Sequence, residues 1–180
     1  MTSQSAVPLD LVLATPDGAA VKLGEHLEQK FTVVQLVRYF GCLPCQEWLV
    51  DLNAVSGTLA EHGAGAIAIG GSADYQATYL REERGVKIPL LLDPEQAFRQ
   101  HVEGAAKPLG WGMANPKGAA AYVGSLAKGF RPQKITRDTV RSPGVVILDQ
   151  SGAVVWSYIG TRIGDYPPVP DVLAAVARLG

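Results

Sequence analysis

The feature that most constrains this chain is a pair of cysteines between a buried strand and an amphipathic helix. Phe31–Val37 is apolar and rich in β-branched residues almost without interruption, which predicts a strand covered on both faces. The C-x-x-C motif Cys42–Cys45 follows, and apolar residues then recur at helical spacing as far as His62. Pro44 fits the first turn of a helix, where no backbone hydrogen bond is needed from its nitrogen. A strand that leads through a C-x-x-C into a helix favours an α/β fold.

Apolar runs and turn signals predict the remaining elements. The expected strands are Leu9–Leu13, Ala20–Leu23, Phe31–Val37, Ala66–Ile69, Leu90–Leu92, Val145–Leu148 and Ala153–Tyr158. The expected helices are Gly24–Gln29, Leu43–His62, Ser72–Arg84, one that begins at Asp93-Pro94, and Asp171–Leu179. This order predicts an α/β sandwich with a mixed central sheet, parallel at its centre and closed by an antiparallel C-terminal hairpin.

Composition excludes several classes of protein. A chain of 180 residues is expected to form roughly one domain, and 47% hydrophobic residues argue against disorder. The net charge of −1 provides no electrostatic reason to bind nucleic acid or an anionic membrane. No apolar run reaches the roughly 18 residues of a spanning helix, and the first residues do not resemble a secretory signal. We therefore expect a cytoplasmic protein with neither a nucleic-acid nor a membrane partner.

Cys42 and Cys45 are the only cysteines of the chain. A structural zinc site usually needs four ligands, and the three histidines stand apart from one another, so we expect no metal and no organic cofactor. At the N-cap of a helix, Cys42 would meet free backbone N–H groups that favour a thiolate. Cys45 lies one turn further on and could form a disulfide with Cys42. The alternative is a pair of inert buried cysteines, since free cysteine is commonly buried.

The stretch Leu36–Trp48, with Arg38 shortly before the Gly-Cys-x-x-Cys, resembles the thioredoxin-like superfamily. Within it, the chain looks like the peroxiredoxin-like group, which is classed with alkyl hydroperoxide reductases and thiol-specific antioxidant proteins and includes prostamide/prostaglandin F synthase-like members. The resemblance implies one thioredoxin-like domain over residues 1–180, with an N-terminal hairpin extension. Residues 104–141, called the insert below, match poorly and lack periodicity, so we expect an irregular segment there.

Two departures from the family pattern bear on the reaction. Peroxiredoxins typically carry P-x-x-x-[T/S]-x-x-C, whose cysteine attacks peroxide; aligned on Cys45, this pattern places Cys42 in the Thr/Ser position and Arg38 in the Pro position. Peroxiredoxins also carry an arginine shortly before a strand that ends in Asp, but here Pro143 stands just before the Gly144–Leu148 strand and Arg141 two residues earlier. Pro143 resembles instead the thioredoxin proline that precedes a strand, has a cis peptide bond before it and faces the C-x-x-C, so the resemblance implies a cis Ser142–Pro143 bond. We therefore favour dithiol chemistry, with Cys42 attacking and Cys45 resolving, whereas the peroxiredoxin alignment would exchange these roles.

Two further features surround the motif. Arg38 lies four residues before Cys42 and could bring a cation to the thiolate, or it could simply reach solvent. In the insert, Trp111 could cover the site or join the core. Six basic residues against one acidic residue between Lys117 and Arg141 could attract an anionic substrate or an acidic redox partner, although such runs are usually solvated surface.

The sequence thus predicts an enzyme, a thiol-disulfide oxidoreductase or peroxiredoxin-like antioxidant reductase that cycles Cys42 and Cys45 between dithiol and disulfide. Its expected substrate is a peroxide, an endoperoxide or a disulfide, and its expected reductant is thioredoxin or a low-molecular-weight thiol. Arg38 and Pro143 complete the predicted site. The alternative is a redox-regulated binding or sensor protein that is oxidised once without turnover. The oligomeric state is left open.

Overall fold

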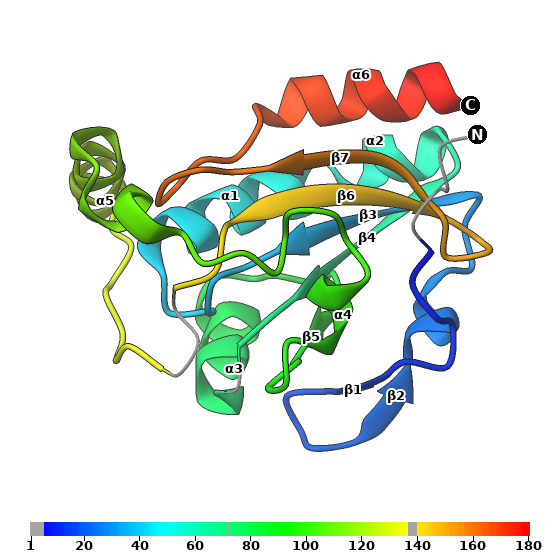
Figure 1. Cartoon of the computed structure of the whole chain (residues 1–180), viewed down its shortest axis with the longest axis horizontal. Helices are drawn as coiled ribbons and strands as arrows, with labels where there is room; N and C mark the ends of the chain where they lie inside the picture. Colours follow the sequence, from blue (N-terminus) through cyan, green and yellow to red (C-terminus); the bar gives the residue numbers. More distant parts are fainter. Residues whose placement is uncertain (1–5, 72, 137–139) are drawn as a thin grey trace.

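A five-stranded mixed sheet forms the centre of the computed structural model, which describes residues 6–71, 73–136 and 140–180 (Figure 1). The strand order is β5-β4-β3-β6-β7, with bounds Leu90–Leu91, Ala64–Ile69, Phe31–Leu36, Gly144–Asp149 and Val154–Ile159. β3, β4 and β5 are parallel, β6 is antiparallel to β3, and β7 is antiparallel to β6. The predicted mixed sheet with an antiparallel C-terminal hairpin is confirmed.

Helices and a small hairpin surround this sheet. The helices are α1 (Leu43–Ala54), α2 (Ser56–Glu61), α3 (Asp74–Glu83), α4 (Ala97–Gln100), α5 (Pro116–Ala127) and α6 (Val169–Leu179). The predicted N-terminal hairpin is confirmed as β1 (Val12–Ala14) and β2 (Ala20–Lys22), followed by the 3-10 turn η1 (Leu23–His26). Ser72, the predicted N-cap of the helix now seen as α3, lies outside the described residues.

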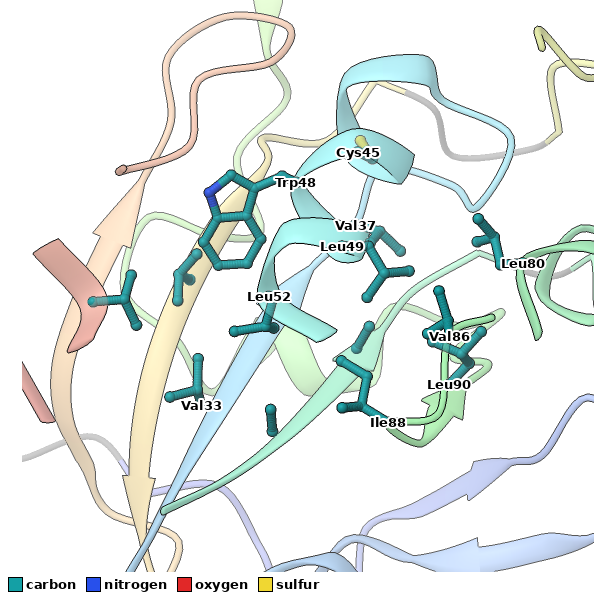
Figure 2. Packing of buried hydrophobic residues seen from close by; sticks show 14 of the residues in the cluster. Val33, Val37, Cys45, Trp48, Leu49, Leu52, Leu80, Val86, Ile88 and Leu90 are labelled. Atoms are coloured by element: carbon teal, nitrogen blue, oxygen red, sulfur yellow. The ribbon is translucent and has the colours of Figure 1, made fainter. Parts of the chain in front are cut away.

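Alternate residues of β3 supply two layers of the core. Val33 belongs to the layer shared with α1, α3 and α6, and Val34 to the layer shared with α4 and the N-terminal hairpin. Figure 2 shows the first layer, in which Leu49 and Leu52 project from α1 toward the sheet. Burial of a side chain of this size stabilises a fold by about 1.5–3 kcal/mol, so this face anchors the helix that carries both cysteines.

The prediction of one continuous helix from Leu43 to His62 is wrong, because the helix is interrupted at Val55 and the segment forms two helices, α1 and α2. The Val55 N–H bonds to the Leu52 carbonyl three residues back, at 3.2 Å, rather than to the fourth. Gly57 lies just beyond this point, and glycine in a helix costs about 1 kcal/mol relative to alanine. The break leaves α1 as a separate, well-buried unit of three turns.

The predicted helix start at Asp93-Pro94 is also wrong by three residues. α4 begins at Ala97, and the Asp93 carboxylate accepts hydrogen bonds from the N–H groups of Ala97 (3.0 Å) and Phe98 (2.9 Å). Gln96 adopts a left-handed conformation with φ of 56°, which a continuous helix does not allow. Asp93 therefore caps α4, but a tight turn separates it from the first residue of that helix.

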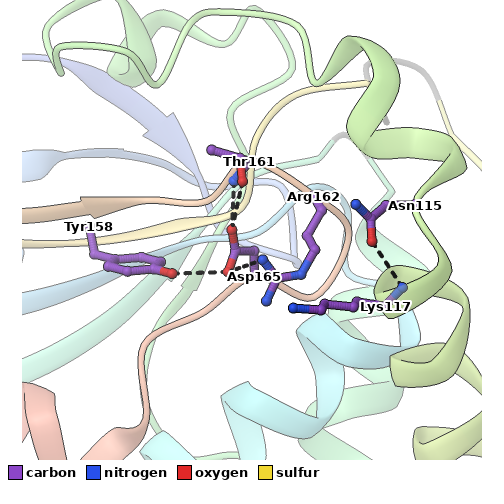
Figure 3. Close-up of polar contacts among 6 residues, drawn as sticks. All are labelled: Asn115, Lys117, Tyr158, Thr161, Arg162 and Asp165. Atoms are coloured by element: carbon purple, nitrogen blue, oxygen red, sulfur yellow. Dashed lines mark hydrogen bonds and ion pairs between the residues drawn. The ribbon is translucent and has the colours of Figure 1, made fainter.

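Part of the insert is regular, contrary to the prediction of an irregular segment. It contains the 3-10 turn η2 (Gly110–Ala114) and the twelve-residue helix α5. Asn115 caps α5 through its side-chain oxygen, which accepts a bond from the Lys117 N–H at 2.9 Å, and Pro116 occupies the first helical position (Figure 3). The run of Gly and Ala in α5 hides the helical period, but the Asn-Pro start was a readable signal.

Trp111 does not join the core, because 93% of its surface is exposed. No helix in the described part of the chain combines the length and apolar character that crossing a bilayer requires. One domain over the whole chain remains a prediction.

Candidate functional site

The two cysteines lie where β3 has ended and α1 begins. Cys42 has extended backbone angles (φ −73°, ψ 119°) and is the N-cap residue, and its carbonyl accepts the first helical bond from Gln46 at 2.9 Å. The preceding Gly41 N–H donates to the side chain of Gln76 on α3 at 3.0 Å. The predicted passage from strand through C-x-x-C to helix is therefore confirmed, and α3 braces the turn before it.

Both thiols are reduced and buried, with Cys42 0% and Cys45 1% exposed. Next to Cys42, the hydroxyl groups of Tyr39 and Tyr122 lie 3.1 Å apart, which links the loop before the motif to α5 of the insert. Burial raises the pKa of both tyrosines, and the nearby Cys42 charge raises them further. The insert thus forms part of the cover over the dithiol, through Tyr122 rather than Trp111.

Arg38 faces the dithiol rather than solvent. Its Nη1 lies 3.5 Å from Cys42 Sγ, and its Nη2 lies 3.3 Å from Met113 Sδ in η2. The side chain is 2% exposed, so its charge acts in a medium that screens it weakly. The structure brings Arg38 and Cys42 together as their spacing suggested, and a cation in this position favours a thiolate.

The two cysteines differ in their tendency to ionise. Burial would raise the pKa of Cys45, but a hydrogen bond from Cys42, the charge of Arg38, the Tyr166 hydroxyl and a backbone hydrogen bond from Arg38 lower it to about 6. Burial raises the pKa of Cys42 well above its ordinary value, and its role as donor to Cys45 adds to this. The surroundings therefore favour the thiolate of Cys45 over that of Cys42.

Tyr166 is a site residue that the sequence analysis missed. Its hydroxyl is 3.1 Å from the Leu36 carbonyl and within hydrogen-bonding reach of Cys45, and its ring stacks on Trp48 with centroids 5.1 Å apart. Trp48 is held in turn by a bond from its Nε1 to the Pro167 carbonyl at 2.7 Å. Only an aromatic residue before a Pro-Pro pair marked this position, and nothing in that pattern indicates a contact with a cysteine.

Asp165 fixes the turn that carries Tyr166 (Figure 3). Its carboxylate accepts bonds from the Tyr158 hydroxyl at 2.9 Å and from the N–H and hydroxyl of Thr161 at 2.8 and 3.1 Å. Arg162 forms an ion pair with it at 3.2 Å. Burial would raise the pKa of Asp165, but these donors and the Arg162 charge lower it below its ordinary value. The carboxylate is thus ionised at neutral pH and holds the turn in place.

A second arginine, Arg99 on α4, is buried beneath the site and was also missed. Its guanidinium donates to the carbonyls of Ser142 at 2.6 Å and Val37 at 2.8 Å. Burial lowers its pKa to about 10, against the opposing effect of charges on Tyr166 and Cys45. It therefore stays charged at neutral pH, and it joins the start of β6 to the end of β3. The sequence signal for a buried Arg99 was its position among the apolar residues of a predicted helix.

The predicted cis peptide bond before Pro143 is wrong, because no described peptide bond is cis. Peptide bonds before proline intrinsically prefer the trans form. Arg99 donates a hydrogen bond to the Ser142 carbonyl, which belongs to this peptide bond, and so fixes its orientation. The Pro143 carbonyl accepts a bond from the Gly160 N–H at 2.8 Å, which ties β6 to the end of β7. A redox role for Pro143 remains a prediction.

A groove of about 680 Å³ borders the redox helix. Pro44, Trp48 and Tyr166 contribute its wall on the side of the dithiol, and α5 and the turn before α6 contribute the rest. On the α5 side, Glu47 accepts a bond from Ser125 at 2.6 Å and pairs with Lys128. Tyr166 lines the groove and lies within hydrogen-bonding reach of Cys45, and neither cysteine is itself among the residues that line the groove. Within the described residues, no three His, Cys, Asp or Glu side chains converge to hold a metal ion.

Comparison with known proteins agrees with this geometry. The family model described as Redoxin matches residues 2–176. Prostamide/prostaglandin F synthase of Pongo abelii is 26% identical over 169 residues, covering 87% of this chain and 80% of the relative, and that of Bos taurus is 24% identical over 166 residues, covering 88% and 80%. The structure of Xanthomonas campestris peroxiredoxin Q has a TM-score of 0.68 at 17% identity, covering 97% of this chain and 98% of that one. A peroxiredoxin-like protein from Aquifex aeolicus has a TM-score of 0.68 at 12% identity, covering 98% and 86%. The predicted thioredoxin-like fold and peroxiredoxin-like kinship are confirmed.

Proposed function

Because the chain belongs to the Redoxin family, we propose that it is a thiol-dependent reductase that cycles Cys42 and Cys45 between dithiol and disulfide. The observation that carries this proposal is the environment of Cys45, whose pKa is lowered to about 6 although the residue is buried. Buried structural cysteines ordinarily have raised pKa values and are inert. A thiolate with a second thiol one helical turn away is suited to two-electron reduction.

We propose that Cys45 attacks and Cys42 resolves, which reverses the preference drawn from the sequence and agrees with the peroxiredoxin alignment. The Cys45 thiolate attacks one peroxide oxygen, the O–O bond breaks, and the leaving alkoxide takes a proton to become an alcohol. Cys42 then attacks the resulting sulfenic sulfur, and its proton leaves with hydroxide as water. For a hydroperoxide, the sum is one peroxide and one dithiol converted into an alcohol, water and a disulfide. For an endoperoxide, Cys45 bonds to one ring oxygen, Cys42 then displaces that oxygen from sulfur, and the substrate leaves as a diol without release of water.

The groove beside Tyr166 supports a bulky organic peroxide or endoperoxide as substrate rather than hydrogen peroxide. Its walls include Trp48, Tyr166 and several prolines, which suit an apolar ligand, and its volume is in the range of small-molecule sites. The relatives named prostamide/prostaglandin F synthases favour the same class. Reduction of the disulfide then requires thioredoxin or a low-molecular-weight thiol.

A redox-regulated sensor is the second candidate. The burial of both sulfur atoms favours it, since a fully covered dithiol is protected from continuous turnover. In this case oxidation would break the hydrogen bond between Cys42 and Cys45 and alter the contacts that Arg38 makes with η2.

Stopped-flow tryptophan fluorescence tests the proposal, because Trp48 stacks on the tyrosine that contacts Cys45. The reduced protein is mixed with cumene hydroperoxide, hydrogen peroxide or a small disulfide, as wild type, Cys42→Ser and Cys45→Ser. We expect the fastest reaction with cumene hydroperoxide, its loss in Cys45→Ser, and a first step that survives in Cys42→Ser without disulfide formation. A Cys45→Ser protein that reacts at the wild-type rate would reverse the roles. Oxidation that stops after one equivalent with dithiothreitol present would favour the sensor.

A further inference from the structure

The insert carries a charge opposite to that of the rest of the chain. It holds seven Lys and Arg residues and one acidic residue, which gives a formal charge of +6. The remaining residues comprise nine basic and sixteen acidic side chains, which gives −7, so the nearly neutral total of −1 conceals a strong separation. A cluster of one sign creates a local field that attracts oppositely charged partners whatever the net charge.

The insert also exposes most of the large apolar side chains found on the surface. Among the described residues nine such side chains are exposed, and six of them lie in the insert, namely Trp111, Met113, Val123, Leu126, Ile135 and Val140. Aromatic residues and methionine are enriched in protein interfaces, and tryptophan is prominent among the residues that dominate binding energy. Trp111, at 93% exposed, packs against little of its own chain.

Two contacts place this apolar surface next to the loop that precedes the redox motif. Met113 lies 3.3 Å from Arg38, and Trp111 is two residues before it in η2. Tyr122 of α5 bonds to the residue that follows Arg38 in the same loop, and Val123 comes directly after it. Figure 1 shows η2 and α5 beside the first turn of α1, where the cysteines lie.

A third contact connects the other end of the insert to the same loop. The Lys134 carbonyl accepts a bond from the Gln76 side chain at 2.7 Å, and Gln76 also accepts from the Gly41 N–H at 3.0 Å. The exposed Ile135 follows Lys134. A protein bound on these side chains would therefore lie against the loop that leads directly into Cys42.

We propose that the docking face, defined as Trp111, Val123 and Ile135 with the exposed Lys117 in the first turn of α5 and Lys134 next to Ile135 in the chain, binds an acidic protein dithiol of the thioredoxin type that reduces the Cys42–Cys45 disulfide. The inference rests on the proposed function and chooses a protein over a small thiol as the reductant. A small thiol has no use for an apolar face with a basic margin, whereas an acidic protein complements both its charge and its area.

Reduction at this face is a two-electron exchange. A thiolate of the docked protein attacks one sulfur of the Cys42–Cys45 disulfide, forms a mixed disulfide and releases the other cysteine as a thiolate. The second thiol of the partner then attacks its own sulfur in the mixed disulfide and releases the remaining cysteine. The protein regains its dithiol with two protons, and the partner leaves as a disulfide.

Steady-state turnover with cumene hydroperoxide tests the docking face. The reductant is either dithiothreitol or an acidic thioredoxin kept reduced by NADPH and thioredoxin reductase. The variants are Trp111→Ala and the double charge reversal Lys117→Glu with Lys134→Glu, each in the full chain. Their matched controls are Val12→Ala, on the exposed N-terminal hairpin, and Lys87→Glu, exposed between α3 and β5.

We expect Trp111→Ala to raise the half-saturating thioredoxin concentration by about tenfold or more, as for a central aromatic in an interface. The charge reversal should raise it by about fivefold, an effect that added NaCl should reproduce in the wild type. Both variants should keep the wild-type rate with dithiothreitol, and both controls should match wild type with either reductant.

Three outcomes overturn the docking face. One is unchanged half-saturation in both variants, and another is turnover with dithiothreitol but none with thioredoxin. The third is a dimer that Trp111→Ala dissociates, measured by analytical ultracentrifugation, while thioredoxin saturation stays the same. Absence of peroxide consumption with either reductant contradicts the proposed function itself, which separates the two failures.

Discussion

Two segments far apart in the sequence reach the dithiol, and they are held in different ways. The turn that leads from β7 to Tyr166 is fixed by the buried Asp165, whose carboxylate is fully engaged by Tyr158, Thr161 and Arg162. The insert reaches the loop before Cys42 through single side-chain contacts and turns most of its large apolar residues outward. The turn before Tyr166 therefore supports the site, whereas the insert mainly presents exposed surface.

The comparison separates two roles around the buried dithiol: one segment supports it rigidly, and the other presents exposed surface near it. Ionisation of Cys45 depends on a hydroxyl group in a fixed position, and the Asp165 turn provides that position. The proposed exchange with a second protein uses the exposed surface of the insert, which contacts the loop before Cys42. The five predictions below test this division, from the largest expected effect on these segments to the smallest.

Among the changes made in these two segments, Asp165→Ala should have the largest effect, because it leaves two hydroxyls, a backbone N–H and a partly buried guanidinium without their acceptor. We expect the free energy of unfolding to fall by about 2–3 kcal/mol at pH 7, measured by urea denaturation. Glu103→Ala, an exposed carboxylate next to the insert, is the control and should stay within about 0.5 kcal/mol of wild type. An Asp165→Ala protein as stable as this control would contradict the supporting role.

The lowered pKa of Asp165 predicts that the free energy of unfolding depends on pH. Its folded-state pKa is lowered, so its contribution to stability is complete above its unfolded pKa of about 3.9 and is lost as pH falls through the folded value. The difference in unfolding free energy between wild type and Asp165→Asn should therefore be constant from pH 6 to 7 and shrink below about pH 4. A difference that grows on acidification would show the opposite linkage.

Arg38→Gln should rank next, since it removes the cation beside both sulfur atoms. The Cys45 pKa of about 6 should rise by about one to two units, and the reaction with cumene hydroperoxide at pH 6 should slow by about tenfold. Because the thiolate forms as pH rises, the loss should disappear above about pH 8. Rates measured from pH 5 to 9 give the test, with the exposed Arg131→Gln of the insert as control. A pH profile that does not shift would show that Arg38 does not lower the pKa of Cys45.

Tyr166→Phe and Tyr122→Phe compare the two segments directly. The Tyr166 hydroxyl donates to the Leu36 carbonyl and lies within hydrogen-bonding reach of Cys45, where it lowers the pKa of that thiol. Its loss should therefore slow the peroxide reaction at pH 6 by about threefold, a smaller effect than that of a full charge. Loss of the Tyr122 hydroxyl removes a bond to another tyrosine and should leave the rate unchanged. The measurement is the second-order rate constant by stopped flow. Equal slowing in both variants would contradict the distinction between support and surface.

Val123→Ala should have the smallest effect. Its side chain is exposed on α5, so the free energy of unfolding should stay within about 0.5 kcal/mol of wild type. Leu52→Ala, in the buried face of α1, provides the contrast and should cost about 2–5 kcal/mol. Thermal and urea unfolding of both variants give the comparison. A large loss of stability in Val123→Ala would mean that the insert is part of the core.

Local patterns predicted most of the fold because they act over a few residues. The continuous apolar run of β3, the Pro44 helix start and the N-terminal hairpin each determine structure through neighbours in the chain, and each was confirmed. The errors occurred where local signals are weak or ambiguous. The Gly- and Ala-rich α5 shows no apolar period, and Asp93 resembles a helix cap whether the helix begins one residue or four residues later.

The sequence alone therefore determined that two cysteines stand at the start of a helix on a mixed sheet, with an arginine four residues before them. Only the tertiary structure shows surroundings that favour the thiolate of Cys45. They include a Tyr166 hydroxyl that comes from 121 positions beyond Cys45, and Arg38, whose charge is effective because it is buried. Hydrogen bonds and charges act through space over a few ångströms, whereas sequence patterns report only neighbours along the chain, so the acidity of a thiol becomes visible only once the chain is folded.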